Sequence, residues 1–246
     1  MIKLLTTAMG ESFSDYFVRV MDPTIAVALG GICLALALAL QFSTKKYVAW
    51  IYWLTVAAVA IFGTMAADVL HKMGISHVTA TIFFGSLLAI IFALWFASEK
   101  TLSIHSIYNP RREAFYWATV LTTFALGTAV GDLTASTMGL GYLSAGVLFA
   151  VLIAMVVIIH FIFETVLGLS HRHLSRNAVF AYWVAYILTR PLGASFADWM
   201  GKAHGLGGLG WGDGTVSFYL TAAIVGLVGY MAVSKKDVSS EDAAAL

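Results

Sequence analysis

The sequence predicts an all-α fold, a polytopic transmembrane helical bundle of eight helices in four parallel two-helix repeats. Composition is the first observation: 60% of the 246 residues are hydrophobic, 11% are charged and the mean hydropathy is +0.88, far from the balance of soluble domains. Repetition is the second: residues 52–68 read YWLTVAAVAIFGTMAAD, residues 116–132 read YWATVLTTFALGTAVGD and residues 182–198 read YWVAYILTRPLGASFAD. Self-similarity of this kind predicts a tandem-repeat architecture.

Each copy of the pattern joins a Tyr-Trp pair to a Gly and, five residues after the Gly, to an Asp. The Trp precedes the Asp by 15 residues in all three copies, which run from Trp53 to Asp68, from Trp117 to Asp132 and from Trp183 to Asp198. A fourth copy, TTAMGESFSD, keeps the same step between Gly10 and Asp15. Counting back 15 residues from Asp15 gives position 0. Two alternatives stay open: a first repeat that is naturally short, or a true start upstream.

Eight apolar runs approach the length of about 20 residues that crosses roughly 30 Å of hydrocarbon. They cover residues 1–18, 24–42, 47–70, 78–96, 115–137, 142–163, 179–200 and 215–233. The odd runs carry the repeated pattern, and a plainer even run follows each of them. Two crossings per repeat return the chain to its starting side, so the repeats are parallel and not inverted. We expect one transmembrane domain over 1–246, with repeats at about 1–46, 47–110, 111–176 and 177–236 and a polar tail at 237–246.

Basic residues in the short loops predict the orientation in the membrane. Nine lie in the even-to-odd loops and the tail: Lys45, Lys46, Lys100, Arg111, Arg112, Arg172, Arg176, Lys235 and Lys236. Three lie on the opposite side: Arg19, Lys72 and Lys202. This asymmetry predicts a multi-pass protein with both termini and the even-to-odd loops in the cytoplasm. Trp53, Trp117 and Trp183 are then expected to anchor the cytoplasmic interface, with the aspartates about 22 Å further out at one level.

Several other classes of protein are excluded or disfavoured. The net charge of +1 does not indicate a nucleic-acid partner, and a single cysteine, Cys33, leaves no disulfide framework or cysteine-based metal cluster. No Ser/His/Asp, HExxH or paired-carboxylate arrangement indicates a catalytic geometry, so we do not expect an enzyme.

The segments EAFYWATVLTTFALGTAVGDL and IFGTMAADVL resemble a known family. It consists of bacterial integral membrane proteins built from four tandem two-helix repeats, each with a characteristic Trp, and it is catalogued as a repeat of unknown function. The resemblance extends over essentially the whole chain. With the predicted orientation, the resemblance implies a multi-pass protein of the bacterial inner (cytoplasmic) membrane with both termini cytoplasmic. It implies the fold and no activity, so function has to be argued from the residues.

The repeated Asp is the sharpest indication of function, because a charge within a bilayer is costly and faces the bundle interior or water. Small residues near each Asp let helix backbones approach closely, which assigns helix packing to Gly10, Gly63, Gly127, Gly193 and Gly131. Four odd helices packed by these faces would bring the aspartates toward one axis, with the residues four positions earlier. The expected ion-binding set is Asp15, Asp68, Asp132, Asp198, Glu11, Thr64 and Thr128. Such oxygen ligands suit a cation.

A structural alternative stays open, because three of the aspartates have a base four residues later: Arg19, Lys72 and Lys202. On that interpretation each Asp forms a helical ion pair with its own base. Asp132 has Ser136 at this position and is the strongest candidate ligand. Three histidines lie near the aspartates, where a solvated-loop role is favoured over metal binding: His71, His77 and His204.

Arg190 is a second anomaly, with Pro191 beside it to loosen the helix. It lies eight residues before Asp198, where the other copies have Thr7, Ala60 and Phe124. A lone Arg at this depth needs a carboxylate, and Glu164, one turn from His160, is the expected partner. The functional interpretation is a gate or a proton-coupling group, and a buried structural pair is favoured over it. An Arg190 that faces a cavity unpaired would instead indicate an anionic substrate.

Together these patterns predict a cation transporter or channel. A divalent metal ion is the preferred substrate, ahead of a monovalent ion or a proton, with the four aspartates as its ligands at an outer site and the Arg190 region as the inner gate. The alternative is a non-transporting membrane scaffold or sensor with structural Asp–Lys/Arg pairs. The expected partners are the lipid bilayer and the inorganic cation, with no nucleic acid; homo-oligomerisation stays open.

Overall fold

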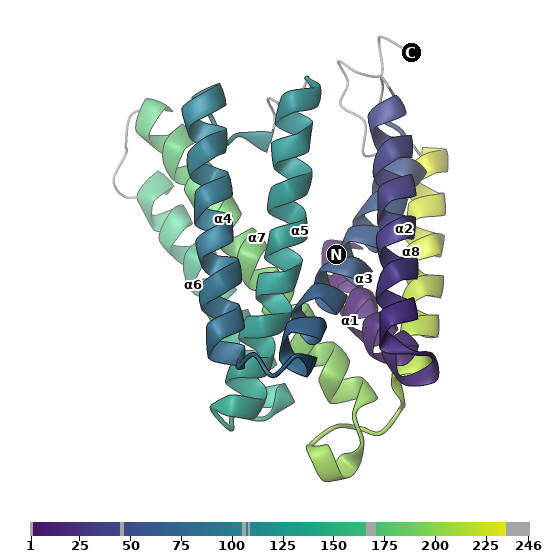
Figure 1. Cartoon of the computed structure of the whole chain (residues 1–246). Helices are drawn as coiled ribbons and strands as arrows, with labels where there is room; N and C mark the ends of the chain where they lie inside the picture. Colours follow the sequence, from purple (N-terminus) through teal and green to yellow (C-terminus); the bar gives the residue numbers. More distant parts are fainter. Residues whose placement is uncertain (1, 45–46, 105–106, 108, 166–170, 235–246) are drawn as a thin grey trace.

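The computed structural model is a bundle of α-helices that run between two ends, where the connecting loops lie (Figure 1). It describes residues 2–44, 47–104, 107, 109–165 and 171–234, without the side chains of 165 and 171–176. The helices are α1 (Ile2–Val20), α2 (Pro23–Ser43), α3 (Ala49–Lys72), α4 (His77–Glu99), α5 (Pro110–Asp132), α6 (Tyr142–Thr165), α7 (His171–Gly201) and α8 (Asp213–Ser234). A π-helical turn, η2 (Leu133–Thr137), extends α5, and a 3-10 turn, η3 (His204–Leu206), lies between α7 and α8. The predicted tail, Lys45, Lys46, Lys235, Lys236 and the side chains of Arg172 and Arg176 lie outside the described residues.

The prediction of an all-α bundle with eight helices is confirmed over the part of the chain that the structure describes. Six of the helices are long and apolar enough to cross a membrane: α2, α3, α4, α5 with η2, α6 and α8. The other two, α1 and α7, contain charged side chains that lie inside the bundle. Glu11 of α1 is 4% exposed and Arg190 of α7 is 1% exposed, so neighbouring helices cover these groups.

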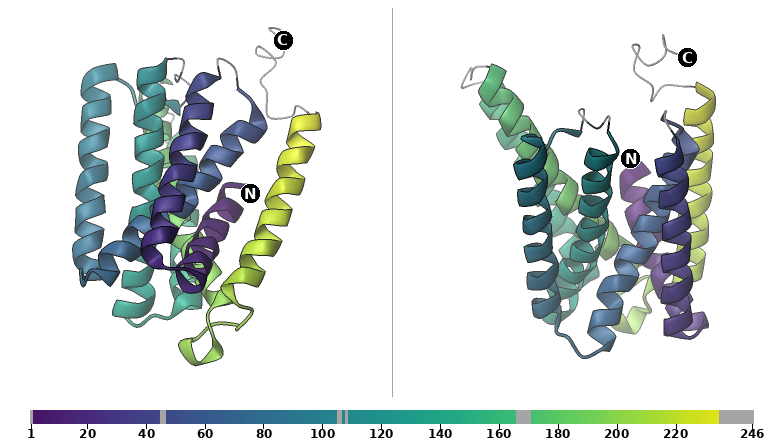
Figure 2. Two further views of the ribbon diagram at one scale, coloured as in Figure 1. Left: turned by 45° about the vertical axis from the view of Figure 1, so that its right-hand side comes forward. Right: turned by 45° about the horizontal axis from the view of Figure 1, so that its top comes forward.

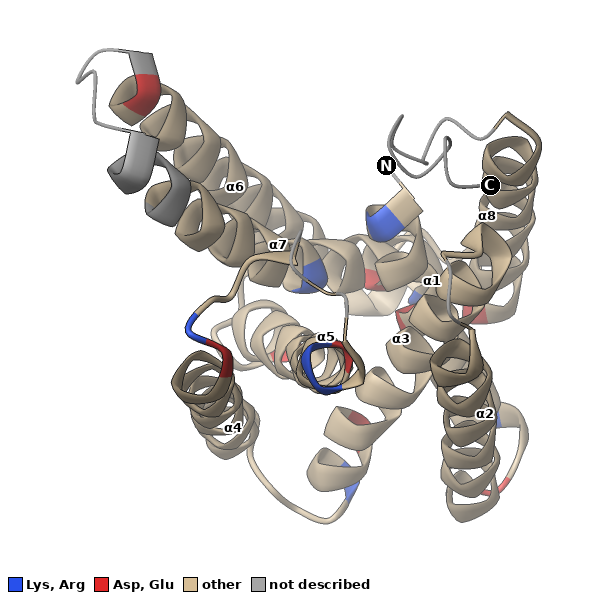
Figure 3. Cartoon of the chain, turned by 90° about the horizontal axis from the view of Figure 1, so that it is seen from above, with Lys and Arg blue, Asp and Glu red and all other residues tan. Residues whose placement is uncertain are grey.

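The helices form two concentric rings. In the inner ring α1 packs on α3, α3 on α5, α5 on α7 and α7 on α1, so the odd helices close on themselves. In the outer ring α2 packs on α3, α4 on α5, α6 on α7 and α8 on α1. Figure 3, which looks down the bundle, shows the odd helices inside the even ones. Each even helix therefore packs on the odd helix of the following repeat, and the last even helix packs on the first odd one.

Glycine makes the close packing of the inner ring possible. A Cβ atom on Gly10, Gly63 or Gly193 would lie 2.6–2.7 Å from a Cβ atom of the next odd helix, closer than real Cβ contacts. The residues met are Ala60 for Gly10, Phe124 for Gly63, Arg190 for Gly127 and Thr7 for Gly193. The glycine of each repeat thus meets the residue eight positions before the Asp of the following repeat, in cyclic order. Gly131 is less crowded, with ordinary contacts from 3.7 Å.

The three repeated tryptophans are buried inside the bundle. Trp53, Trp117 and Trp183 are 8%, 4% and 4% exposed. Trp183 packs edge-on against Trp95 and donates its indole N–H to the carbonyl of Leu102 at 2.9 Å. Their assignment as anchors in the lipid interface is therefore wrong, because the repeat turns these rings toward neighbouring helices.

The first helix differs from the other three odd helices. It is 19 residues long, whereas α3, α5 and α7 have 24, 23 and 31. Figure 2 shows α1 enclosed by its neighbours and beginning part-way along the bundle.

The outer helices expose large apolar side chains on the outside of the bundle. Leu36 and Ile82, for example, are 65% and 64% exposed, as a lipid-facing surface requires.

Candidate functional site

Polar side chains form a column along the centre of the inner ring. Four-residue steps back from each repeated Asp keep to nearly the same helix face, so each step delivers one residue per odd helix to this centre. We name the layers by their contents: the aspartate layer (Asp15, Asp68, Asp132 and Asp198), the Glu11 layer (Glu11, Thr64, Thr128 and Ala194), the Arg190 layer (Thr7, Ala60, Phe124 and Arg190), the Lys3 layer (Lys3, Val56, Val120 and Tyr186) and the tyrosine layer (Tyr52, Tyr116 and Tyr182). Together they are the axial column.

In the aspartate layer, Lys202 joins two repeats. Its ammonium forms an ion pair with Asp15 of α1 and lies 3.4 Å from Asp198 of α7. Asp68 accepts a hydrogen bond from the hydroxyl of Ser14 at 2.8 Å, which links α3 to α1. Asp132 lies apart from these contacts, with its Oδ2 3.8 Å from Nδ1 of His77 on α4.

Lys202 is charged at neutral pH. Burial disfavours its ammonium form, but the carboxylates of Asp198 and Asp15 outweigh burial and hold the pKa of Lys202 above its usual range. The side chain is 17% exposed, so its charge is only partly screened by solvent. An internal cation thus already neutralises part of the aspartate layer.

This arrangement differs from the predicted metal site made of the four aspartates, which stays a prediction. Across the described residues, no group of three or more His, Cys, Asp or Glu side chains is arranged to hold a metal ion. The physical reason lies in the partners that the sequence pattern did not reveal. Lys202 forms ion pairs with Asp15 and Asp198, Ser14 donates a hydrogen bond to Asp68, and Asp132 lies near His77.

The structural alternative, in which each Asp folds back on its own base, holds for one repeat only. Asp198 lies 3.4 Å from Lys202, four residues later. Arg19 does not pair with Asp15; it lies 2.8 Å from Asp213 at the start of α8, whose side chain is 3% exposed. The Arg19–Asp213 pair and the Lys202–Asp15 pair instead join different repeats, so these charges act between helices.

The Glu11 layer is the most enclosed polar cluster of the column. Thr128 donates its hydroxyl to Oε2 of Glu11 at 2.8 Å, and Thr64 donates to the same oxygen at 3.3 Å. The two hydroxyls lie 3.2 Å apart. Glu11, Thr64 and Thr128 are 4%, 1% and 2% exposed. Three repeats therefore meet at one carboxyl oxygen, as the convergence of odd helices requires.

In the Arg190 layer, the guanidinium has no carboxylate partner among the described residues. Its Nη1 donates to the hydroxyl of Thr7 at 2.8 Å, while Nε and Nη2 are buried without a hydrogen bond. The group lies between two rings, 3.8 Å from the centroid of Phe124 and 4.3 Å from that of Tyr186. Cation–π contacts of this kind offset part of the cost of burying the charge.

The expected pair between Arg190 and Glu164 is therefore wrong. Glu164 lies on the outer helix α6 with 54% of its side chain exposed, 4.0 Å from His160. Arg190 projects in the opposite sense, into the inner ring, because α7 carries it on the face that Gly127 contacts.

The Lys3 and tyrosine layers complete the column. Lys3 donates to the hydroxyl of Tyr182 at 3.2 Å, and its ammonium lies 4.9 Å from the ring centroid of Tyr186. The hydroxyls of Tyr52 and Tyr116 lie 2.6 Å apart. Sequence reasoning treated the tyrosines only as part of a repeated pair and missed Lys3. The available signal was the same four-residue step, continued below Arg190.

The fold and this column define a polytopic membrane protein of four parallel repeats with an ionisable interior. The chain belongs to the family described as Repeat of Unknown Function (DUF347), whose model matches residues 51–101, 115–165 and 181–237. The matched segments correspond to the second, third and fourth repeats. No curated protein and no solved structure matches the chain.

Proposed function

We propose that this protein moves a cation across the bilayer along the axial column, and that the cation is a proton. The observation that carries the proposal is Glu11, whose carboxyl is buried in the inner ring where hydroxyls of two other repeats converge on one oxygen. Ionisable side chains inside membrane bundles are costly, and where they occur they commonly belong to proton relays or ion pathways. The aspartate layer beside Glu11 supplies the carboxylates through which a proton reaches it.

Two internal cations favour a proton over a metal ion. A divalent ion at the aspartate layer would have to displace Lys202 from Asp15 and Asp198. A hydrated cation that passed Glu11 would next meet the guanidinium of Arg190, at close range and in a region of low dielectric. A proton avoids the first obstacle, because it binds a carboxyl without displacing an ion. The second obstacle, the guanidinium of Arg190, is removed for a proton if Arg190 acts as a gate that moves aside during transfer.

In the proposed cycle, a proton from the aspartate layer adds to the carboxylate of Glu11. The neutral carboxyl then donates a hydrogen bond to Thr64 or Thr128, from which it previously accepted one, and that hydroxyl turns its own hydrogen away. Loss of the proton on the other side restores the carboxylate. Arg190 opposes passage of any larger cation between the two states, so the column transfers protons without leaking metal ions.

We propose that the aspartate layer lies on the outer side of the membrane and the tyrosine layer on the cytoplasmic side. Lys100, Arg111 and Arg112 are at the ends of helices beside the tyrosine layer, and positively charged loops favour the cytoplasm. In a bacterial inner membrane, the proton gradient would then drive protons from the aspartate layer toward Lys3.

Proton flux into proteoliposomes tests the proposal. Purified protein is reconstituted around a pH-sensitive dye, and a potassium diffusion potential drives protons inward. We expect Glu11→Gln to lower the flux at least tenfold. Glu164→Gln makes the same chemical change at an exposed carboxyl of α6 and should keep the parental flux. Equal flux in parent and Glu11→Gln, with both proteins folded by thermal unfolding, would rule Glu11 out as the relay.

A second candidate, a membrane scaffold or sensor without transport, is favoured by one set of contacts. Lys202 ties α7 to α1 through Asp198 and Asp15, and Arg19 ties α1 to α8 through Asp213. On this alternative the charges hold the inner ring together and nothing passes through it. Parental liposomes would then show no flux above empty ones, while Lys202→Gln would still lower the unfolding temperature.

A further inference from the structure

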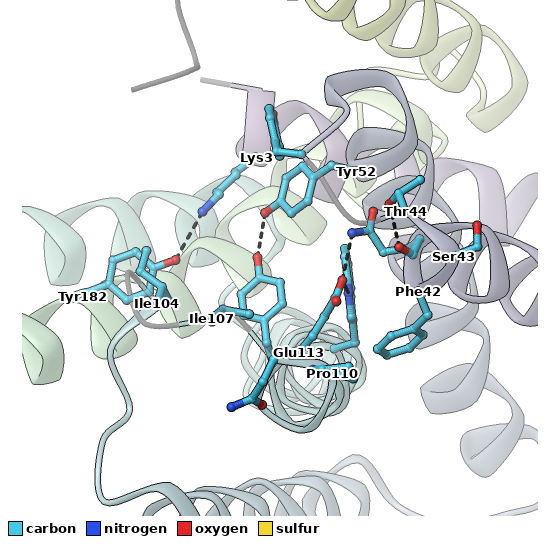
Figure 4. A pocket seen from close by; sticks show the side chains of 15 residues that line it. Lys3, Phe42, Ser43, Thr44, Tyr52, Ile104, Ile107, Pro110, Glu113 and Tyr182 are labelled. Carbon is cyan, nitrogen blue, oxygen red and sulfur yellow. Dashed lines mark hydrogen bonds between the residues drawn. The ribbon is translucent and has the colours of Figure 1, made fainter. Parts of the chain in front are cut away.

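A cavity opens at the tyrosine end of the axial column. Its volume is about 710 Å³, within the range of small-molecule sites. Figure 4 shows side chains that line it, with Lys3 and Tyr182 on one side and Glu113 on another. Tyr52 and Tyr116 border the cavity as well, so it lies directly over the tyrosine layer.

Among the residues that the structure describes, the ammonium of Lys3 in this cavity has no carboxylate in contact with it. Lys3 forms a hydrogen bond with a neutral phenol, Tyr182, and no carboxylate lies within ion-pair distance of it in the described residues. Glu113 is engaged elsewhere, since its Oε1 accepts from Gln41 at 2.8 Å and from the indole of Trp117 at 3.3 Å. An ammonium at the floor of a cavity, with phenol hydroxyls around it, has the donors that an anion requires.

Arg190, a second cation without a carboxylate partner in the described part of the chain, lies one turn deeper. Thr7 connects the two, because its hydroxyl donates to the carbonyl of Lys3 at 2.8 Å and accepts from Arg190 at 2.8 Å. The remaining donors of Arg190, Nε and Nη2, are buried and without partners. A buried guanidinium with unused donors is destabilising unless negative charge is supplied nearby. The carboxylate of Glu11, in the next layer beyond Arg190, supplies at most one negative charge for these two cations, which leaves the other for a ligand to supply.

We propose that this cavity binds a small organic monocarboxylate. Its carboxylate would pair with Lys3 and accept from the hydroxyl of Tyr182, at the end nearest Arg190. Its apolar body would lie against Phe42 and Ile107, which also line the cavity. The space greatly exceeds an inorganic anion, and Glu113 on the wall disfavours a second negative charge on the ligand. This proposal does not depend on proton transport. It gives the protein an anionic ligand in addition to the proton.

If both proposals hold, the two sites are linked along the column. The charge of Arg190 creates a positive electrostatic potential between the cavity and Glu11, and this potential is a barrier to a proton. A carboxylate bound at Lys3 lowers this potential. Anion binding would then favour proton transfer. If the anion moved together with the proton, the net charge moved would be the sum of the two.

Isothermal titration calorimetry on the full chain in detergent tests the site, with sodium benzoate as the probe and benzamide as its neutral analogue of similar shape. We expect benzoate to bind and benzamide to bind at least tenfold more weakly. Lys3→Gln should weaken benzoate at least tenfold, and Lys3→Arg, which keeps the charge, should restore most of the affinity. Lys72→Gln is the matched control, because Lys72 is exposed at the other end of α3, and it should bind benzoate as the parent does.

Each other outcome overturns the proposal. Equal binding of benzoate and benzamide would indicate an apolar cavity without an anion site. Binding of sodium phosphate or chloride in place of benzoate would indicate an inorganic-anion site. Unchanged benzoate affinity in folded Lys3→Gln would remove Lys3 from the site. The liposome assay contains no carboxylate ligand, so failure of this proposal and failure of proton transport are distinguished.

Discussion

Replacing Gly10 by Ala tests the packing that closes the inner ring. The added Cβ would lie 2.7 Å from the Cβ of Ala60, 2.8 Å from its carbonyl carbon and 3.1 Å from its carbonyl oxygen. Two of the three atoms belong to the backbone of α3, so no side-chain rotation relieves the contact. Because Ala60 is fully buried, α1 and α3 have to move apart.

The expected cost follows from a comparison with a second glycine. Overpacking of this kind costs about 1–3 kcal/mol. Replacing a helical Gly by Ala also stabilises the helix by about 1 kcal/mol, which hides part of the cost. Gly226 of α8 is the control, because a Cβ there meets nothing within 4 Å and carries only the helix gain. The difference between Gly10→Ala and Gly226→Ala therefore isolates the steric cost.

Thermal unfolding in detergent, followed by tryptophan fluorescence, measures this difference. For a chain of this size, about 1–3 kcal/mol corresponds to an unfolding temperature roughly 2–12 °C lower in Gly10→Ala than in Gly226→Ala. Adding Ala60→Gly removes one of the three clashing atoms and should recover part of the loss, as a double-mutant cycle reports. Equal unfolding temperatures for Gly10→Ala and Gly226→Ala would refute the close approach of α1 and α3.

Three further changes probe contacts between repeats by the same unfolding assay. Arg19→Gln should cost about 1 kcal/mol or more, because it leaves the buried Asp213 without its cation. The control Arg111→Gln removes a similarly exposed arginine that lies 3.8 Å from its acid, Glu99, and should cost almost nothing. Lys202→Gln should lower the stability of the protein by the same amount from pH 7 to pH 9. The reason is that the pKa of Lys202 is raised in the folded protein, and a raised lysine pKa contributes its full stability at every pH below the pKa in the unfolded chain, about 10.4. A stability difference between parent and Lys202→Gln that vanishes by pH 8 would contradict this. Trp183→Phe should cost about 1 kcal/mol through its lost hydrogen bond, and no change would show that the indole N–H is dispensable.

The overall architecture was predictable because repetition and hydropathy act on the whole chain. Eight helices and a parallel repeat follow from them directly, and the described part of the structure has both, although six of the eight helices are long and apolar enough to cross a membrane. The convergence of Glu11 with Thr64 and Thr128 was predictable too, since identical helix faces in symmetry-related positions have to meet. The even helices, which carry no pattern, gave no indication that each packs on the following repeat.

The partners of the charged side chains were not predictable from local spacing. A base four residues after an acid suggests a pair within one helix, but Arg19 and Lys202 both reach acids on other helices. Arg190 was assigned a carboxylate because a buried charge needs compensation, and the structure instead gives it two aromatic rings and Thr7. Such choices depend on the angle at which each helix faces the centre, which a linear pattern does not contain.

The contact between α8 and α1 bears on how the protein is made. Helices enter a membrane in the order of their synthesis, so α1 emerges well before α7 and α8, two of the helices on which it packs. Until α7 and α8 have been inserted, the carboxyl of Glu11 and the ammonium of Lys3 are not covered by the helices that surround them in the complete inner ring. We expect α1 to remain beside the insertion machinery, or at the membrane surface, until the fourth repeat arrives. Assembly would then end with the first helix, and premature release before α7 would leave a chain that the membrane does not retain in its native form.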